Sequence, residues 1–519
     1  MSNNYYLEVG KASDLKNWKD RAIFRTFEIF PGALSWGALC LAVLLSWKQP
    51  LLVAVFIILL SFFWFFRTIY FSIHLWAGYK RMAEHEKINW VEKLNGLKIE
   101  NCKLKIANWR DIYHLVVIPM YEEPIEVVRD SFRALASNDY PKNKMIVMLA
   151  CEEKVKRAVK KTVETIEKEF NNKFFKFSVV WHPANIPGEI IGKGSNETWA
   201  AKKAKELIID PLKIPYENII FSSFDVDTCI FPKYFSCLAY HYLTSKKPTR
   251  TSFQPVPLFV NNIWQAPVFS RIISFSSTFW HTMNQERPEK LITFSSHSMS
   301  FKALVEVGFK QTNVVSDDSR IFWQCFFQFN GDYRVQPLYY PLSMDANVAK
   351  SFWKTLSNLY KQQRRWAYGV GDIPYFLFGF LKNKKIPFGK KFSLALELIE
   401  GHFSWAVASI LIFLLGWLPS FIGGFEFSHS IISYNLSKIV GRVMTMAMVG
   451  IVASCYFSLI LLPPRPPEYG RFKYLVFALS WILCPIIMVF FVSVPAIDAQ
   501  TRWMLGKYMG FLATEKVRK

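Results

Sequence analysis

The sequence predicts an α/β domain inserted between helices that cross a membrane. Long apolar runs stand at both ends of the chain, and a polar, charged stretch of roughly residues 79–385 separates them. Within that stretch short apolar runs alternate with helix-like segments, which predicts a parallel sheet with right-handed crossovers. Such sheets bind ligands at the carboxyl ends of their strands, and the acidic strings of this chain fall at such ends or in loops.

Two apolar runs, residues 29–47 and 51–75, predict a helical hairpin through a bilayer. The first run lies too far from the N-terminus to be a signal peptide, and it lacks a small-residue cleavage site. Buried core helices are the alternative, but apolar runs of about 20 residues are uncommon in soluble proteins. Basic residues before the first run predict a cytoplasmic N-terminus. They are Lys11, Lys16, Lys19, Arg21 and Arg25.

Three further apolar stretches follow the polar middle, at roughly residues 392–421, 439–462 and 474–494. Five crossings from a cytoplasmic N-terminus would leave the basic C-terminal tail outside, and the charge asymmetry opposes that placement. Three alternatives remain open. Residues 425–434 belong to an extra or re-entrant segment, or Pro485 marks a broken helix, or the tail lies outside.

The composition narrows the class of partner. The formal net charge is +23, which suits nucleic acid, anionic lipid or phosphate-bearing substrates. The basic residues cluster beside the apolar runs and no nucleic-acid motif is present, so we expect membrane lipids and a nucleotide as partners and no nucleic acid. The 8 Cys residues include no CxxC pair. This predicts free thiols in a reducing cytosol, with neither a zinc site nor a disulfide framework.

The predicted elements of the middle segment alternate between strand and helix. In order they are a strand at 114–118, a helix at 124–136, a strand at 144–150, a charged helix ending near 170, a strand at 175–181, a helix at 196–207 and a strand at 218–224.

Asp225 and Asp227 come directly after the strand at 218–224. Two closely spaced carboxylates at a strand end can hold a hard divalent cation and the diphosphate that it clamps. A solvated turn is the alternative for so short a string. The position after an apolar strand, in a chain with the strings described next, favours a binding site.

Two strings further along the chain add other chemistry. Asp317 and Asp318 offer a carboxylate that can act as a general base, and a helix N-terminus is a compatible alternative. Gln362 and Arg365, spaced i and i+3, share a helix face, and with Trp366 they can grip phosphate oxygens and a sugar. A cationic amphipathic helix lying on the membrane is the alternative for this string, and both interpretations can hold together.

These strings, in this order, resemble the signature of the membrane-bound, inverting family 2 glycosyltransferases, which include cellulose, chitin and hyaluronan synthases. The resemblance implies a GT-A (Rossmann-like) glycosyltransferase domain and a nucleotide-sugar donor, with a UDP-sugar expected. It implies that Asp227 ligates Mg²⁺ or Mn²⁺ and that Asp225 contacts the ribose and the metal's surroundings. Asp318 would be the base, although this chain has Ser-Asp-Asp where the family carries Thr-Glu-Asp, which leaves Asp317 as the next candidate.

The resemblance also assigns roles on the donor and acceptor sides. Arg365, with Gln362 beside it, would stabilise the leaving diphosphate, and Trp366 would stack on the acceptor sugar. Lys193, in a glycine-rich segment before a helix, would contact a phosphate or the base; a flexible turn capped by Ser195 or Asn196 is the alternative.

Two weaker positions complete the set. Glu152 would bind the uracil or ribose, although the family more usually has Asp there, and a helix-capping acid pair with Glu153 is the alternative. His297 lies where the family has its acceptor-binding loop, but a structural role is the more common one for a lone His. The Gln254-Pro255 and Asn261-Asn262 pairs carry little specificity.

The expected protein is an integral membrane protein of the cytoplasmic or inner membrane with its catalytic domain in the cytosol. Its divisions would be a segment with a transmembrane hairpin (1–78), the GT-A domain (79–348), interfacial helices (349–391) and C-terminal transmembrane helices with a tail (392–519). The expected function is inverting, metal-dependent sugar transfer to a growing polysaccharide, with possible extrusion. The alternatives are transfer of a single sugar to a lipid or lipid-linked acceptor, and a scaffold or transporter without catalysis.

Overall fold

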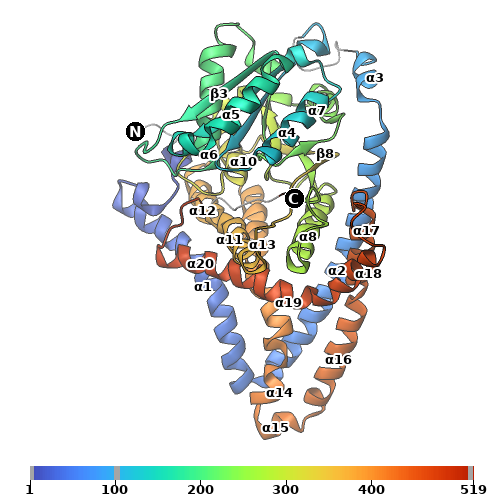
Figure 1. The fold of residues 1–519 in the computed structure, drawn as a ribbon. Coiled ribbons are helices and arrows are strands. Elements are labelled where there is room, and N and C mark those ends of the chain that lie inside the picture. The colour runs from blue at the N-terminus through green and yellow to red at the C-terminus, as the bar shows by residue number, and fades with distance from the viewer. Residues whose placement is uncertain (1–4, 99–103, 105, 512–517, 519) are drawn as a thin grey trace.

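The computed structural model describes residues 5–98, 104, 106–511 and 518. An α/β domain lies above a group of long helices, and the chain enters and leaves that domain through them (Figure 1). The order of the elements therefore confirms the predicted architecture, a Rossmann-like α/β domain inserted between apolar helices.

The α/β domain is built on one sheet, whose strand order in the described residues is β3-β2-β1-β4-β7-β6-β8-β5. The first four of these strands are parallel: β1 (Tyr113–Met120), β2 (Met145–Glu152), β3 (Lys176–His182) and β4 (Ile219–Ser223). They match the four predicted strands. β1 shows why they read as continuous apolar runs, since Leu115 and Val116 face opposite sides of the sheet and both are fully buried.

Three helices connect the parallel strands: α4 (Ile125–Ser137), α5 (Lys156–Phe170) and α6 (Lys193–Ala204). All three agree with the predicted helices. α6 begins at Lys193, earlier than the predicted start at Asn196, with Gly192 as its N-cap. The capping roles suggested for Ser195 and Asn196 are therefore wrong, because both residues lie inside the helix.

The other half of the sheet is mixed, so the prediction of a parallel sheet is wrong there. β7 (His297–Ser300) is antiparallel to β4 and to β6 (Thr251–Leu258). β8 (Arg334–Ser343) is parallel to β6 and antiparallel to the short β5 (Cys229–Ile230).

Proline explains why β6 was not predicted. Pro255 and Pro257 lie inside this strand, and proline in a central strand normally argues against such an assignment. The pairing of β6 with β8 shifts register between Gln254 and Val256, and this irregularity accommodates a residue that cannot donate to the ladder.

Five helical segments of the described chain are long and apolar enough to cross a membrane. They are α1 (Trp18–Lys48), α2 (Pro50–Lys87), α13 (Phe388–Phe413), the segment Ile431–Ile460, which comprises α16 (Ile431–Ala447) and α17 (Val449–Ile460), and the segment Phe472–Leu505. α14 (Leu418–Ile422) and α15 (Gly424–Ser428) join α13 to α16 at the end remote from the sheet (Figure 1).

The last apolar segment differs from the others in direction. It is divided into α18 (Phe472–Ser480), α19 (Cys484–Met488) and α20 (Val494–Leu505), and Pro485 stands in the first turn of α19. The segment lies across the other long helices rather than alongside them (Figure 1). The segment stays helical from Phe472 to Leu505, through a 3-10 turn at Trp481–Leu483 and a π-helical turn at Val489–Ser493, so the backbone does not break at Pro485.

The end of the chain returns to the α/β domain. Arg518 donates hydrogen bonds to the carboxylates of Asp130 and Asp345, at 2.8 and 2.9 Å, and both acceptors belong to that domain. The C-terminus and the sheet therefore lie on the same side of the apolar helices. The described residues 425–434 form the short α15 and the start of α16 and no additional span.

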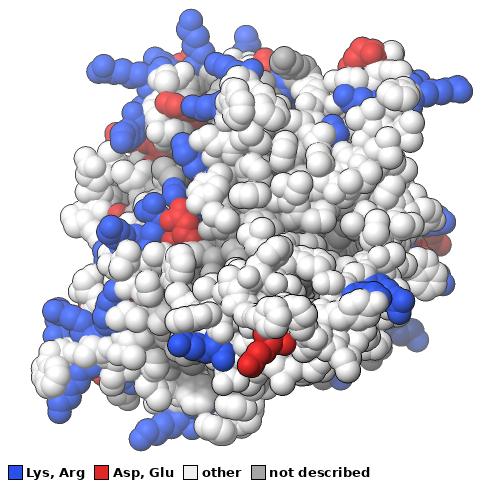
Figure 2. Space-filling model, turned by 90° about the horizontal axis from the view of Figure 1, so that it is seen from below, with Lys and Arg blue, Asp and Glu red and all other residues white. Residues whose placement is uncertain are grey.

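Two helices separate the sheet from the long apolar helices. α11 (Phe352–Ala367) and α12 (Asp372–Lys382) lie between these layers, where α12 contacts α10 (Asp317–Gln328) and α11 contacts α20 (Figure 1). Seen from below, the molecule is mostly uncharged, and Lys and Arg side chains gather along its edge (Figure 2). An uncharged face with a basic margin suits an anionic lipid surface.

Candidate active site

The candidate site lies where β4 ends. The chain continues from Ser223 through Phe224 and Val226, which are buried in the core. Asp225 retains about a quarter of its side-chain exposure, whereas Asp227 is only 1% exposed. The two carboxylates of the string therefore differ in environment: one faces an open site and the other lies within the domain.

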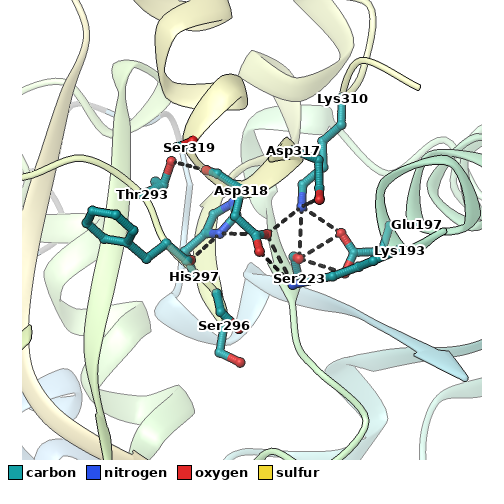
Figure 3. A network of polar contacts seen from close by, with 12 residues as sticks. Lys193, Glu197, Ser223, Thr293, Ser296, His297, Lys310, Asp317, Asp318 and Ser319 are labelled. Carbon is teal, nitrogen blue, oxygen red and sulfur yellow. Dashed lines mark hydrogen bonds and ion pairs between the residues drawn. The ribbon is translucent and has the colours of Figure 1, made fainter. Parts of the chain in front are cut away.

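Lys193 joins two of the predicted residues. Its ammonium group lies 2.8 Å from Asp225 Oδ1 and 2.8 Å from Asp318 Oδ2. Lys193 stands in the first turn of α6 and Asp318 in the first turn of α10 (Figure 3). Through Asp225 the ammonium also contacts the loop after β4, so it bridges two helix starts and that loop. Three positions that the sequence singled out separately thus converge on one point.

A second lysine, which the sequence did not single out, lies behind this group. Lys310 is 3% exposed, and its ammonium group contacts Glu197 at 2.6 Å, Asp317 at 2.9 Å and Asp318 at 3.1 Å (Figure 3). It also donates to Ser223 Oγ at 3.0 Å. Lys310 lies in a loop without any motif, so only the fold reveals that it neutralises these carboxylates.

Glu197, Asp317 and Asp318 lie close enough together to resemble a metal site, since one carboxylate oxygen of each lies within 4.8 Å of the others. The ammonium of Lys310 contacts all three of them, so this group of carboxylates already has a cation. Asp317 is 3% exposed, and Gly194 approaches so closely that a Cβ there would lie 2.7 Å from Asp317 Cβ. Asp317 is therefore enclosed by protein, whereas Asp318 remains accessible.

The charges of the site set the proton affinities of the two neighbouring acids in opposite directions. Burial would raise the pKa of Asp318, but the ammonium groups of Lys193 and Lys310 outweigh it and hold that pKa well below its usual range. Burial and the adjacent charge of Asp318 raise the pKa of Asp317. Asp318 is therefore the carboxylate of this pair that stays ionised.

His297 lies beside the same carboxylate. Its Nδ1 is 3.8 Å from Asp318 Oδ1 and donates a hydrogen bond to the carbonyl oxygen of Phe294 at 2.9 Å. Burial lowers the pKa of His297 to about 3, so the imidazole is neutral. Thr293 fixes the same turn of α10, since its hydroxyl donates to the carbonyl oxygen of Asp318 at 2.6 Å.

Asp227 is placed by the strand-end loop of β8. The backbone N–H of Asp345 donates to Asp227 Oδ2 at 3.0 Å, and Asn261 donates to the carbonyl oxygen of Asp227 at 3.0 Å. Arg518 also approaches this carbonyl oxygen, at 3.3 Å. Carboxylate oxygens are the ligands that Mg²⁺ and Mn²⁺ prefer, so the donor set of Asp225 and Asp227 fits either ion.

Glu152 ends β2 and lies opposite His182 at the end of β3. His182 lies between two acids, with Nδ1 3.1 Å from Glu152 Oε2 and Nε2 3.0 Å from Glu189 Oε2. Burial opposes the charge on His182, but the hydrogen bonds and charges of both acids outweigh it and raise its pKa. The other oxygen of Glu152 is buried, and no described residue bonds to it. Glu152 is therefore part of a hydrogen-bonded triad with His182 and Glu189 at a strand end rather than a helix cap.

The predicted residues Gln362, Arg365 and Trp366 lie on α11, next to the site. The helix predicted there is confirmed, and Asn347 donates to Gln362 Oε1 at 3.2 Å. Burial lowers the pKa of the Arg365 guanidinium, and the carboxylates of Asp225 and Asp318 act in the opposite direction. Trp366 is half-buried and packs against Phe259, with ring centroids 5.9 Å apart.

Phe511 closes one side of the site. The Arg365 guanidinium lies over its ring at 4.8 Å from the centroid. A Cβ at Gly192 would lie 2.5 Å from Phe511 Cγ, so only glycine at the start of α6 permits this contact. The segment that follows α20 therefore touches both the Lys193 turn and α11, which the sequence did not indicate.

Two pairs to which the sequence gave little weight hold the loops of the site. Gln254 Oε1 accepts a hydrogen bond from the backbone N–H of Phe294 at 2.9 Å, which fixes the segment before His297. Asn262 accepts one from the N–H of Ala346 at 2.8 Å. These side chains support the site's loops, and neither contact requires a ligand.

Comparison with known proteins gives a likeness only at the level of structure. No family model matches this chain, and no curated protein matches it in sequence. One similar solved structure is the mannosyltransferase PcManGT from Pyrobaculum calidifontis in complex with GDP-Man and Mn²⁺, with 14% identity and a TM-score of 0.37, covering 75% of this chain and 99% of that chain. Another is S. aureus TarS 1-349 in complex with UDP-GlcNAc, with 12% identity and a TM-score of 0.37, covering 76% and 93%.

Proposed function

We propose that this protein transfers a sugar from a nucleotide-sugar, with a UDP-sugar as the expected donor, to a glycan or lipid-linked acceptor at a membrane. The observation that carries the proposal is the position of Lys193. Its ammonium group lies 2.8 Å from Asp225, on the proposed donor side, and 2.8 Å from Asp318, the proposed base. A donor diphosphate bound there would bring its sugar next to a carboxylate able to activate an acceptor hydroxyl.

The donor would lie along the carboxyl ends of the parallel strands. Glu152, whose buried oxygen has no bond from a described residue, suits the uracil or ribose, and Asp225 suits the ribose. Lys193 and Arg365 supply positive charge for the diphosphate. This distribution places acids beside the hydroxyl and N–H donors of the nucleoside, and cations beside the phosphate oxygens of the nucleotide-sugar.

Asp227, with Asp225, would hold Mg²⁺ or Mn²⁺ through carboxylate oxygens. When bound, the ion supplies charge neutralisation for the diphosphate that leaves. Arg365 performs the same task from α11, and its burial strengthens its electrostatic effect on the leaving group.

Asp318 would remove the proton from the acceptor hydroxyl, whose oxygen then attacks the anomeric carbon in line and inverts it. In the absence of donor, two ammonium groups lower the proton affinity of Asp318. A diphosphate that takes Lys193 as its partner removes one of these two contacts, so donor binding would raise the basicity of Asp318. The base would then become effective only when the donor is in place.

Two kinds of acceptor suit the side of the site where Trp366 lies. Trp366 can stack on a sugar at the end of a growing polysaccharide, which would be extruded through the apolar helices. The alternative is a single addition to a lipid or lipid-linked acceptor, and the apolar helices beneath α11 favour it, because they provide a surface from which a lipid can reach the site. In either case the α/β domain (residues 79–348) would be cytosolic, with residues 349–391 at the membrane surface.

The proposal is tested with full-length protein in detergent, incubated with a panel of UDP- and GDP-sugars, Mg²⁺ or Mn²⁺, and lipid or glycan acceptors. Release of the nucleoside diphosphate and the size of the labelled product are measured together. We expect one donor to be turned over, and turnover to be lost in Asp318→Asn. The matched control is Asp332→Asn, an exposed acid paired with Lys247, which should keep full activity. Turnover that survives in Asp318→Asn would contradict the proposal.

A further inference from the structure

Three side chains of metal-binding type meet where α2 contacts the α/β domain. They are His85, near the end of α2, and Cys237 and His241 on α7 (Tyr234–Thr244). One ligand atom of each lies within 4.8 Å of the other two. Cys237 and His241 are spaced i and i+4, so they share one face of α7. None of the three belongs to the candidate transfer site.

β8 orients both imidazoles. His85 Nδ1 lies 2.9 Å from the carbonyl oxygen of Leu338, and only a protonated Nδ1 can donate to it, which leaves the lone pair on Nε2. His241 Nδ1 lies 3.0 Å from the side-chain amide of Gln336. The Gln336 Nε2–H donates to this Nδ1, so metal binding requires the Gln336 amide to flip, after which Nδ1 donates to Oε1 and His241 Nε2 carries the lone pair. Hydrogen bonds of this kind to the second ring nitrogen accompany most metal-binding histidines.

The nitrogen that His241 directs away from Gln336 is buried, and no described residue bonds to it. Cys237 is completely buried beside it. A neutral imidazole is the form that binds a metal ion. A buried thiol deprotonates when a cation compensates for its charge.

Aromatic rings enclose the cluster on one side. Trp90, in α3 (Trp90–Asn95), contacts both imidazoles, with ring centroids 5.2 Å from His85 and 5.3 Å from His241. Lys93 lies over the ring of Trp90, and its charge opposes a second cation nearby. The thiolate of Cys237 is therefore needed to compensate for a bound ion.

We propose that His85, Cys237 and His241 bind a zinc ion, with a water molecule as the fourth ligand. Two imidazoles and one thiolate form a borderline-soft donor set that selects Zn²⁺ over the Mg²⁺ or Mn²⁺ expected at Asp227. Zinc binding would bring the three ligand atoms to about 2.0–2.3 Å from the ion. On binding, the thiol of Cys237 releases one proton to solvent and its sulfur forms the bond to zinc.

The position of this ion would give it a structural role. His85 belongs to an apolar helix, and Cys237 with His241 belongs to a helix packed on the sheet. A zinc ion shared by the two would fix the α/β domain to the end of α2. The chain has no CxxC pair, and for that reason its sequence predicted no zinc site. His85 is remote from α7 in the chain, and only the fold brings the three side chains together.

The test uses full-length protein in detergent, stripped of metal and then titrated with Co²⁺ and Zn²⁺. Cobalt bound to a thiolate gives a charge-transfer absorption in the near ultraviolet, which carboxylate ligands such as those of the transfer site do not produce. We expect one equivalent of Co²⁺ to generate this band and one equivalent of Zn²⁺ to remove it. Zinc should also raise the thermal unfolding midpoint of the wild-type protein.

Variants assign the band to residues. Cys237→Ala and His85→Gln should abolish it, and Gln336→Leu should weaken metal affinity by about 10–100-fold, since it removes only the orienting hydrogen bond. The matched control is Cys325→Ala, which removes another buried cysteine, on α10. His85→Gln changes a partly exposed residue and serves if Cys237→Ala does not fold. A wild-type protein without the band, or a band that persists in His85→Gln, would overturn the proposal.

Discussion

Lys193 and Asp318 form an ion pair of 2.8 Å between the first turns of two different helices, α6 and α10. The pair brings a group suited to phosphate and a group suited to proton transfer into direct contact. Lys193 is 9% exposed, so solvent screens the pair only weakly. The predictions below follow from this arrangement and from the groups that surround it.

The first prediction concerns the metal. Asp227→Ala should abolish sugar transfer without unfolding the protein, because the carboxylate would hold an ion that arrives with the donor. Turnover is measured across a range of Mg²⁺ and Mn²⁺ concentrations, and folding is checked by the thermal unfolding midpoint. Full activity of the wild type in excess chelator would contradict the assignment of Asp227 as a metal ligand.

The second prediction concerns Lys310 and stability. Lys310→Met leaves the buried Glu197 and Asp317 without their shared cation, so the free energy of unfolding should fall by about 3–5 kcal/mol. The control is Lys247→Met, which removes an exposed pair with Asp332 and should change stability by about 0–1 kcal/mol. Denaturant unfolding of both variants in detergent measures the difference. Equal effects of the two substitutions would show that the buried cluster does not depend on Lys310.

The third prediction concerns pH. Glu152 and Glu189 raise the pKa of His182, so the folded protein binds its proton more tightly than the unfolded chain does. The resulting stabilisation is fully present below the unfolded pKa of about 6.5 and is lost as pH rises through the raised folded value. The unfolding midpoint of the wild type should therefore exceed that of His182→Gln most at low pH. A difference that grows with rising pH would have the wrong sign.

The fourth prediction separates the roles of Arg365 and Trp366. Arg365→Ala removes charge beside the proposed diphosphate site and should suppress all turnover. Trp366→Ala should weaken the hold on the acceptor by about 1–3 kcal/mol, by analogy with base stacking on aromatic rings. Donor hydrolysis should then persist while long product disappears. If product length is unchanged in Trp366→Ala, the ring serves only in packing against Phe259.

The sequence was sufficient for the parts of the structure that depend on local pattern. The four parallel strands were predicted because each is a short apolar run, and β1, β2 and β4 are buried on both faces. The helices α4, α5 and α11 were predicted because their apolar residues follow helical spacing. β6 was missed because Pro255 and Pro257 contradict a strand locally, and tertiary pairing with β8 overrides that signal.

The residues of the candidate site likewise divide into those that local sequence patterns identify and those that only the fold brings in. Asp225, Asp318 and Lys193 were identified from short strings, and the fold brings them together. Lys310 and His182 were not identified, because nothing in their neighbouring residues marks them and their partners come from distant segments. Contacts of that kind are set by the tertiary fold and cannot be predicted from local sequence patterns.

The most direct test of the proposed function is a comparison of Asp318→Asn with the wild type in donor turnover and donor binding. The variant keeps the shape of the side chain but cannot accept the acceptor's proton, so turnover should fall by about 10²–10⁴-fold. Donor affinity, measured by calorimetry, should be retained, because Lys193 and Asp225 would remain in place to hold the donor. Loss of donor affinity with an unchanged turnover number would contradict the assignment of Asp318 as the base and would direct attention to Asp317.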